Sequence, residues 1–170
     1  MNKISDDILC KVEKPSRYVG GELNQVIKNP KDVDIRFAFC FPDVYEVGMS
    51  HLGTRILYHT INLREDTYCE RTFAPWPDME ELMRKNNISL YTLETKDSLD
   101  KFDMVGFTLQ YEMSFTTVLN MIDRAQIPVK ASERGEDDPI IIAGGPCAYN
   151  PEPMADFIDV FLIGDGEEVL

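Results

Sequence analysis

Residues 33–41, VDIRFAFCF, form an apolar run that ends at Pro42. An apolar run of this length closed by a breaker is typical of a buried strand. Five later segments of strand length predict further strands, at 67–73, 88–93, 103–109, 139–143 and 159–163. Several of these segments are apolar throughout instead of alternating, which favours strands that are covered on both faces, as in a parallel sheet.

Amphipathic helices are predicted between these strands. Spacings of three and four place one set of residues on a single helix face: Tyr45, Met49, Leu52, Ile56, His59 and Leu63. Other helices are predicted at 22–27, 78–83, 115–125 and 153–158. The helix at 78–83 would begin with a capping box of Asp78 and Glu81. This alternation predicts a Rossmann-like, doubly wound α/β fold, a mostly parallel sheet of about five strands with helices on both faces.

The composition sets the class of protein. The chain has 170 residues, 44% of them hydrophobic, which is enough for one domain with a core. We predict an arm or loop over residues 1–32, which contain several Pro and Gly breakers, and one α/β domain over 33–170. The net charge of −13 argues against a surface for nucleic acid or anionic lipid. Without a membrane-length apolar run or a signal-peptide core, the sequence indicates a soluble cytoplasmic protein.

The four cysteines are far apart in the sequence, at Cys10, Cys40, Cys69 and Cys147. No pair has the spacing of a zinc or iron–sulfur motif, so we expect no metal site built from this chain alone. Cys40 lies in an apolar strand and is predicted to be a core residue. Cys147 follows a Gly-rich turn and is predicted to be a loop thiol.

The carboxyl ends of the predicted strands indicate where a ligand would bind. In an open parallel sheet, ligands bind at this edge, where the strand order reverses. The segments that follow four of the strands begin at Pro42, Thr108, Gly144 and Gly164. Two of these segments open with glycine, which permits sharp turns and a close approach of the backbone to a ligand.

These segments carry a family resemblance. DVYEVG at 43–48, GFTLQYE at 106–112, GGP at 144–146 and GDGEE at 164–168 resemble the cobalamin-binding-type domain that precedes the barrel in one class of radical SAM proteins. More narrowly, the sequence is similar to a family of uncharacterised radical SAM proteins with a B12-binding domain. This narrower similarity rests on RYVGGELN at 17–24, FAPWPDME at 73–80 and GGPCAYNPEPMADFIDVFLIGDGEE at 144–168.

The resemblance implies a partner domain and its cofactors. In such proteins the barrel follows this domain, and a three-cysteine loop in the barrel holds a [4Fe–4S] cluster that cleaves S-adenosylmethionine. That loop is absent from these 170 residues, so the cluster and S-adenosylmethionine are expected in the downstream domain. We expect the chain to be part of a longer protein, because the residues after Gly164 are predicted to form a turn and the start of a helix.

The resemblance also implies cobalamin as a candidate cofactor. The cobalamin motif is D-x-H-x-x-G, whose His binds cobalt, and the matching residues here are Asp43, Tyr45 and Gly48. Because a phenol with a pKa near 10 is a poor cobalt ligand, cobalamin would be bound base-on or without a protein ligand. A second element, S-x-L, would fall at Thr108 and Gln110. The candidate cofactor-binding residues are Asp43, Tyr45, Gly48, Thr108, Gln110, Gly144, Gly145 and Gly164.

Several of these residues have a structural alternative. Asp43 would also cap a helix, and Tyr45 would also pack as an ordinary aromatic. His51 lies near the presumed ligand end of its helix and could reach a cofactor, but a solvated side chain is favoured. His59 is expected to lie in the core or at its boundary. Glu112 would open its helix.

Two other functions stay open. The domain could be a structural or docking module without a cofactor of its own, and the Tyr at position 45 favours this alternative. A free-standing nucleotide or flavin binder is disfavoured, because the chain has neither G-x-G-x-x-G nor a P-loop.

Overall fold

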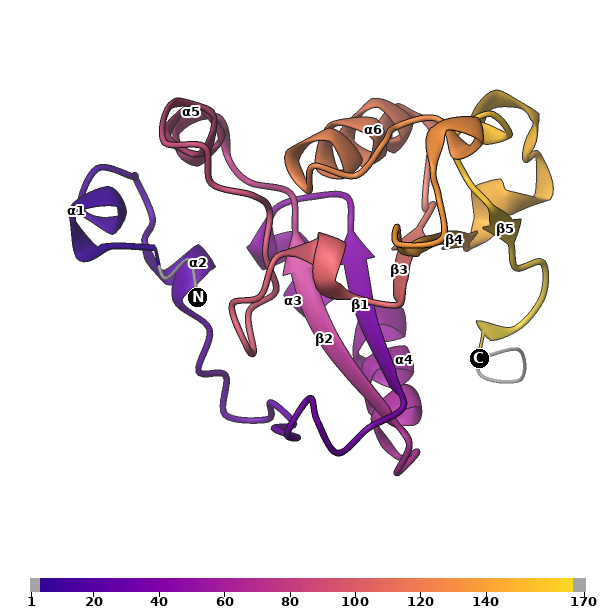
Figure 1. The fold of residues 1–170 in the computed structure, drawn as a ribbon, viewed down its shortest axis with the longest axis horizontal. Helices are drawn as coiled ribbons and strands as arrows, with labels where there is room; N and C mark the ends of the chain where they lie inside the picture. The colour runs from indigo at the N-terminus through magenta and orange to yellow at the C-terminus, as the bar shows by residue number, and fades with distance from the viewer. Residues whose placement is uncertain (1–3, 167–170) are drawn as a thin grey trace.

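Five parallel strands form one sheet in the computed structural model, which describes residues 4–166 (Figure 1). The strands are β1 (Ile35–Phe41), β2 (Thr67–Phe73), β3 (Met104–Thr108), β4 (Ile140–Gly144) and β5 (Val160–Phe161). Their order in the sheet is β2-β1-β3-β4-β5, and every pairing is parallel. The predicted Rossmann-like α/β fold is confirmed. The order reverses between β1 and β3, so a ligand-binding crevice is expected at their carboxyl ends.

Helices cover both faces of the sheet (Figure 1). Helix α4 (Leu52–Asn62) packs on one face, where Tyr58 and Ile61 contact Phe37 and Phe39 of β1. Helices α5 (Pro77–Lys85) and α6 (Phe115–Arg124) share a core with the opposite face. The side chains of β1 alternate between these two cores, as the two-residue period of a strand requires.

The helix predicted over 45–63 is two helices, α3 (Tyr45–Ser50) and α4. They separate at His51, whose backbone is extended and whose ring caps α4. The predicted apolar face was wrong, since Leu52 and Leu63 are exposed and His59 is exposed as well. The buried face of α4 consists instead of Thr54, Tyr58, Ile61 and Asn62.

The strand predicted at 88–93 is also wrong. These residues are an extended segment whose β-structure is one isolated bridge, between Tyr91 and Ser98. The segment is held to β2 by hydrogen bonds from Leu93 N to the Arg71 carbonyl, from the Thr72 hydroxyl to the Tyr91 carbonyl and from the Thr92 hydroxyl to the Glu70 carboxylate. Leu90 is buried in the core with α5 and α6 and Leu93 is buried beside Phe73 of β2, so apolar content alone did not distinguish the segment from a sheet strand.

Three predictions about short helices also differ from the structure. Helix α5 starts with Pro77 after Trp76, and Asp78 forms no capping box. Residues 22–27 are not helical, and 153–158 contains only the end of a 3₁₀ turn. The 3₁₀ turns are η1 (Leu99–Lys101), η2 (Glu112–Ser114), η3 (Ala131–Glu133), η4 (Pro146–Tyr149) and η5 (Glu152–Met154). The predicted helix start after Gly166 lies outside the described residues.

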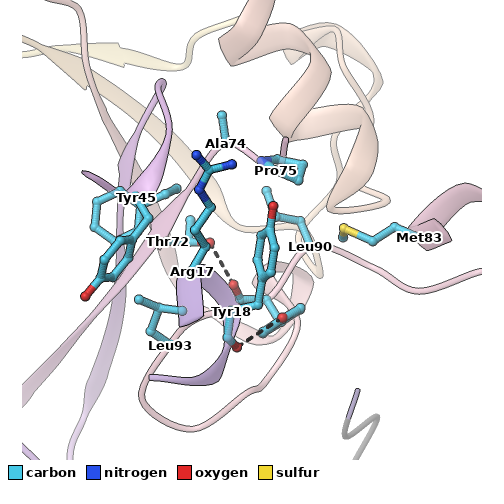
Figure 2. A pocket seen from close by; sticks show the side chains of 11 residues that line it. Arg17, Tyr18, Tyr45, Thr72, Ala74, Pro75, Met83, Leu90 and Leu93 are labelled. Carbon is cyan, nitrogen blue, oxygen red and sulfur yellow. Dashed lines mark hydrogen bonds between the residues drawn. The ribbon is translucent and has the colours of Figure 1, made fainter. Parts of the chain in front are cut away.

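The amino-terminal arm packs along the edge of the domain through α1 (Asp6–Leu9) and α2 (Ser16–Val19). Figure 2 shows the contact of α2, where Arg17 and Tyr18 lie among residues that follow β2 and the segment at 90–93. The Arg17 guanidinium pairs with Glu46 at 2.9 Å. The cavity enclosed there is about 20 Å³, which is room for about one water molecule, so we interpret it as a packing gap.

Candidate ligand site at the carboxyl edge of the sheet

A cavity of about 140 Å³ lies where the strand order reverses. Its wall brings together five of the eight predicted cofactor-binding residues: Thr108, Gln110, Gly144, Gly145 and Gly164. These residues come from the ends of β3 and β4 and from the segment after β5. The rest of the wall comes from β1, from His51 and the first two turns of α4, and from other residues of β3, of β4 and of the segment after β5. The structure therefore places these five predicted residues around one hollow, although they are up to 56 positions apart in the sequence.

The floor of the cavity is apolar and depends on a glycine. Phe37 and Phe39 of β1 and Ile142 of β4 form most of it. A Cβ at Gly106 would lie 2.5 Å from Cζ of Phe37, so the missing side chain lets the Phe37 ring extend across β3. Only glycine provides this space.

Two backbone hydrogen bonds hold the turn after β4 against the end of β3. Leu109 N donates to the Gly144 carbonyl at 2.7 Å, and Cys147 N donates to the Leu109 carbonyl at 3.0 Å. Gly145 has φ 99°, and a Cβ there would lie 3.0 Å from the Leu109 oxygen. These contacts hold the glycine turn beside Thr108, whose hydroxyl accepts a hydrogen bond from the Gln110 amide.

His51 closes the cavity on the α4 side. Its Nδ1 accepts a hydrogen bond from Thr54 N at 3.2 Å, so the side chain is the N-cap of α4. Its ring packs 5.1 Å from the ring of Phe41. The expectation of a solvated His51 is wrong, because the residue is half-buried and lines the cavity.

Sequence reasoning placed His51 near the ligand edge but missed the rest of the α4 contribution, which consists of Gly53, Thr54 and Leu57. A signal was available, because a helix that follows the first strand begins at the carboxyl edge of the sheet. The break at His51 was the missing information, since it places a new helix start there. Gly166, near the end of the described residues, lines the same cavity.

The other three predicted residues lie outside this cavity. Asp43 accepts hydrogen bonds from Val44 N at 2.7 Å and from the Tyr111 hydroxyl at 3.1 Å. It does not cap α3, whose N-cap is Val44, so the predicted capping role is wrong. Gly48 lies against the Phe73 ring, where a Cβ would be 2.3 Å from a ring carbon.

Tyr45 is engaged within the fold. Its hydroxyl donates a hydrogen bond to Glu22 of the arm, and its ring meets Phe73 edge-on at 5.5 Å. Burial, with the nearby Glu22 carboxylate, raises the pKa of Tyr45 to about 12. The phenol is therefore protonated at neutral pH, and as placed it is unsuited to bind a metal ion.

A wider and more open hollow of about 400 Å³ adjoins the cavity, and Gln110 lines both. Its other walls include Glu112, Phe115, Cys147 and Tyr149. Partial burial, with the nearby Glu112 carboxylate, raises the pKa of Cys147, so this thiol stays protonated at neutral pH.

The described lining of the cavity carries no acidic or strongly basic side chain. Among residues 4–166, none of those that line it is Asp, Glu, Lys or Arg. In the same part of the chain, no three His, Cys, Asp or Glu side chains are grouped as a metal site would require. The described lining thus consists of apolar residues and glycines with four polar side chains, those of His51, Thr54, Thr108 and Gln110.

The fold and the position of the cavity define a doubly wound α/β domain with a ligand crevice at its switch point. The family described as radical SAM proteins, N-terminal, matches residues 53–170, and the chain belongs to that family. It is also similar to an uncharacterized protein of Methanocaldococcus jannaschii, with 28% identity over 131 residues. That match covers 76% of this chain and 24% of the relative. No solved structure matches.

The chain thus spans about a quarter of the length of this relative. None of the helices between residues 4 and 166 is long and apolar enough to cross a membrane.

Proposed function

We propose that this domain forms a cofactor or substrate chamber beside the catalytic barrel of a radical SAM protein. The observation that carries the proposal is the convergence of Thr108, Gln110 and three glycines on one cavity at the switch point. The family membership supports the partner, which would be the downstream domain of the same chain. That domain would hold the [4Fe–4S] cluster and S-adenosylmethionine, and these residues would shape the space next to it.

Cobalamin is the candidate cofactor, and the described residues fit one end of it. The neutral, apolar cavity suits the heterocyclic base of its nucleotide loop, and the open hollow beyond Gln110 leaves room for a larger ring. When bound, cobalamin would supply a cobalt centre for group transfer such as methyl transfer. The residue at the cobalt-ligand position does not fit, because the Tyr45 hydroxyl is bonded to Glu22. Cobalamin would therefore be held without a protein ligand to cobalt.

Retention of cobalt by the protein tests the cofactor. The full-length protein and the 170-residue chain would each be incubated with excess hydroxocobalamin and desalted, and cobalt per chain would be measured by mass spectrometry. We expect close to one cobalt per full-length chain. Absence of cobalt from both samples would reject cobalamin as the cofactor.

A second candidate function is a docking module without a cofactor. It is favoured by the engagement of Tyr45 and by apolar side chains exposed on the carboxyl-edge loops, namely Tyr111 (44%), Met113 (84%) and Tyr149 (73%). This alternative predicts that no cobalt is retained. It also predicts that polar substitutions at Met113 and Tyr149 separate the domain from the rest of the protein in limited proteolysis.

A further inference from the structure

We propose that the α4 side of strands β3, β4 and β5 is an interaction surface for a further helix of the same protein, formed by the chain that continues from Gly166. The proposal rests on apolar side chains of the sheet that no helix of residues 4–166 covers. It goes beyond the proposed function, and it holds whether or not a cofactor binds.

The two faces of β4 differ in exposure. Ile141 and Ala143 are 0% exposed, in the core that this face shares with α5 and α6. Ile140 and Ile142 alternate with them along the strand and therefore point to the α4 side. Ile142 packs in the core shared with α4, but Ile140 is 44% exposed. The apolar side chain at the start of β4 thus lies on a part of the sheet that α4 does not reach.

The neighbouring strands continue this apolar surface. Met104 of β3 is in register with Ile140, and Val160 of β5 is in register with Ile142, so each pair points to the same side of the sheet. Met104 is partly buried, and Val160 is 42% exposed. Leu162, two residues after Val160, is also only partly buried. We call Met104, Ile140, Val160 and Leu162 the uncovered face.

The handedness of the fold explains why this face is left open. Crossovers between parallel strands are right-handed, so connections that run in opposite directions along the sheet pack on opposite faces. The connection from β1 to β2 puts α4 on one face, and the connection from β3 to β4 runs the other way and puts α6 on the opposite face (Figure 1). The connection to β5 runs in this second direction as well. A helix over the uncovered face therefore has to come from the chain before β1 or after β5.

The amino-terminal arm does not supply this helix. Four of its apolar residues pack with the core of the opposite face: Ile4, Ile8, Leu9 and Tyr18. Val26 packs with the α4 core, but it lies in a stretch without helix. The chain after β5 is therefore the source that remains.

The chain after β5 has already turned onto the α4 side. A Cβ at Gly166 would lie 3.1 Å from Cδ2 of Leu57, so Gly166 lies beside α4, and its backbone is helical. It follows the carboxyl end of the last strand. A helix that continues from it would run back towards the amino ends of the strands, as the helices of a parallel α/β sheet do, and would cross the uncovered face.

The sequence at this point favours a helix with an apolar side. Asp165 and Glu168 have the spacing of a capping box. Val169 and Leu170 follow Gly166 by three and four residues, so in a helix they share the side that Gly166 turns towards α4. The first apolar residues would thus face the sheet.

A helix of ordinary length is sufficient. Strands β3 and β4 have five residues each, which corresponds to a length of about 16 Å. A helix of about 11 residues covers the same distance. The family that the chain belongs to is described as the amino-terminal part of radical SAM proteins, which supports further chain after this domain.

Photo-crosslinking of the full-length protein tests which segment covers the face. The photoreactive residue p-benzoylphenylalanine would replace Ile140, and cross-linked peptides would be identified by mass spectrometry. We expect a product of monomer mass in which position 140 is joined to a peptide within about 15 residues after Gly166, the reach of one helix. The same replacement at Leu63, which is 68% exposed on the outer side of α4, is the control and should not label that peptide.

Two outcomes of this experiment would overturn the proposal. A product of twice the monomer mass would assign the face to a second copy of the chain, and a cross-link to any other part of the chain would assign it to another segment. Neither readout involves cobalt, so the cobalamin proposal stands or fails separately.

Cysteine labelling gives an independent measurement if the bulky replacement impairs folding. In the full-length protein, maleimide labelling of Ile140→Cys, quantified by peptide mass spectrometry, should be at least about tenfold slower than labelling of Leu63→Cys, because a covered thiol reacts only when the helix opens. Equal rates for the two variants would show that the face is open to solvent and would overturn the proposal.

Discussion

The Tyr45 hydroxyl donates a hydrogen bond to the Glu22 carboxylate, which ties the first turn of α3 to the amino-terminal arm. Tyr45 occupies the position of the cobalt-binding His in the cobalamin motif. Because its hydroxyl is bonded to Glu22, this side chain is not available as a ligand to cobalt. The bond stabilises the fold, and Tyr45 is not among the residues that line the cavity at the switch point.

The first prediction concerns Tyr45→Phe. Loss of the hydrogen bond to half-buried Glu22 should lower the free energy of unfolding by about 1 kcal/mol, measured by urea denaturation. Retention of hydroxocobalamin by the full-length protein should not change. If cobalt is lost while stability is kept, the phenol has a direct role in binding.

The second prediction compares two neighbouring glycines. Gly145 has φ 99°, and a Cβ there would lie 3.0 Å from a carbonyl oxygen. Gly145→Ala should therefore cost about 1–3 kcal/mol of unfolding free energy. Gly144→Ala is the matched control, because its nearest atom would be 3.7 Å away, and it should cost less than about 0.5 kcal/mol. Equal losses of stability in the two variants, measured by thermal denaturation, would show that Gly145 is not packed against the Leu109 backbone.

The third prediction concerns a buried ion pair beneath the arm. The Arg71 and Glu94 side chains are 3% and 1% exposed and lie 2.8 Å apart, and burial raises the pKa of Glu94. Glu94→Gln would leave a buried guanidinium without its counter-charge, so we expect a loss of roughly 3–5 kcal/mol.

Glu80→Gln is the control for this pair, because Glu80 pairs with Arg84 on the surface of α5. It should cost less than about 0.5 kcal/mol. Chemical denaturation of both variants would measure the difference. Equal small losses would show that water reaches the Arg71–Glu94 pair.

The fourth prediction is a pH dependence of stability from Lys96. Burial lowers its pKa to about 8, whereas an unfolded lysine has a pKa near 10.4. Between these values the unfolded chain binds more protons than the folded chain, so the free energy of unfolding rises with pH through this window. Lys96→Met should remove that rise. A parallel pH profile for the variant and the parent between pH 8 and 10.5 would contradict this assignment.

The sheet was predictable because its central strands are apolar on both faces. Phe39, Val105 and Ile141 each lie in such a run, and each is buried in the structure. The segment at 88–93 was mistaken for a strand because Leu90, Tyr91 and Leu93 are buried although the segment pairs with no strand of the sheet. Local composition is the same in both cases, so only tertiary packing separates them.

The candidate site was predictable on one side only. The glycine turns after β4 and β5 could be placed because chain breakers mark strand ends. On the α4 side only His51 was placed near the ligand edge, because the rest of that wall depends on the helix break at His51. Without that break, the periodicity assigned Leu52 and Leu63 to the buried face, although both are exposed.

The most direct test of the ligand site is the affinity for hydroxocobalamin of two Trp variants of the full-length protein. Leu57→Trp would fill the cavity, while Leu52→Trp adds the same side chain on the exposed face of α4, where Leu52 is 66% exposed. Visible-absorbance titration should show binding to Leu52→Trp as tight as to the parent, and binding to Leu57→Trp at least tenfold weaker. Equal affinity of the two variants would show that the ligand does not enter this cavity.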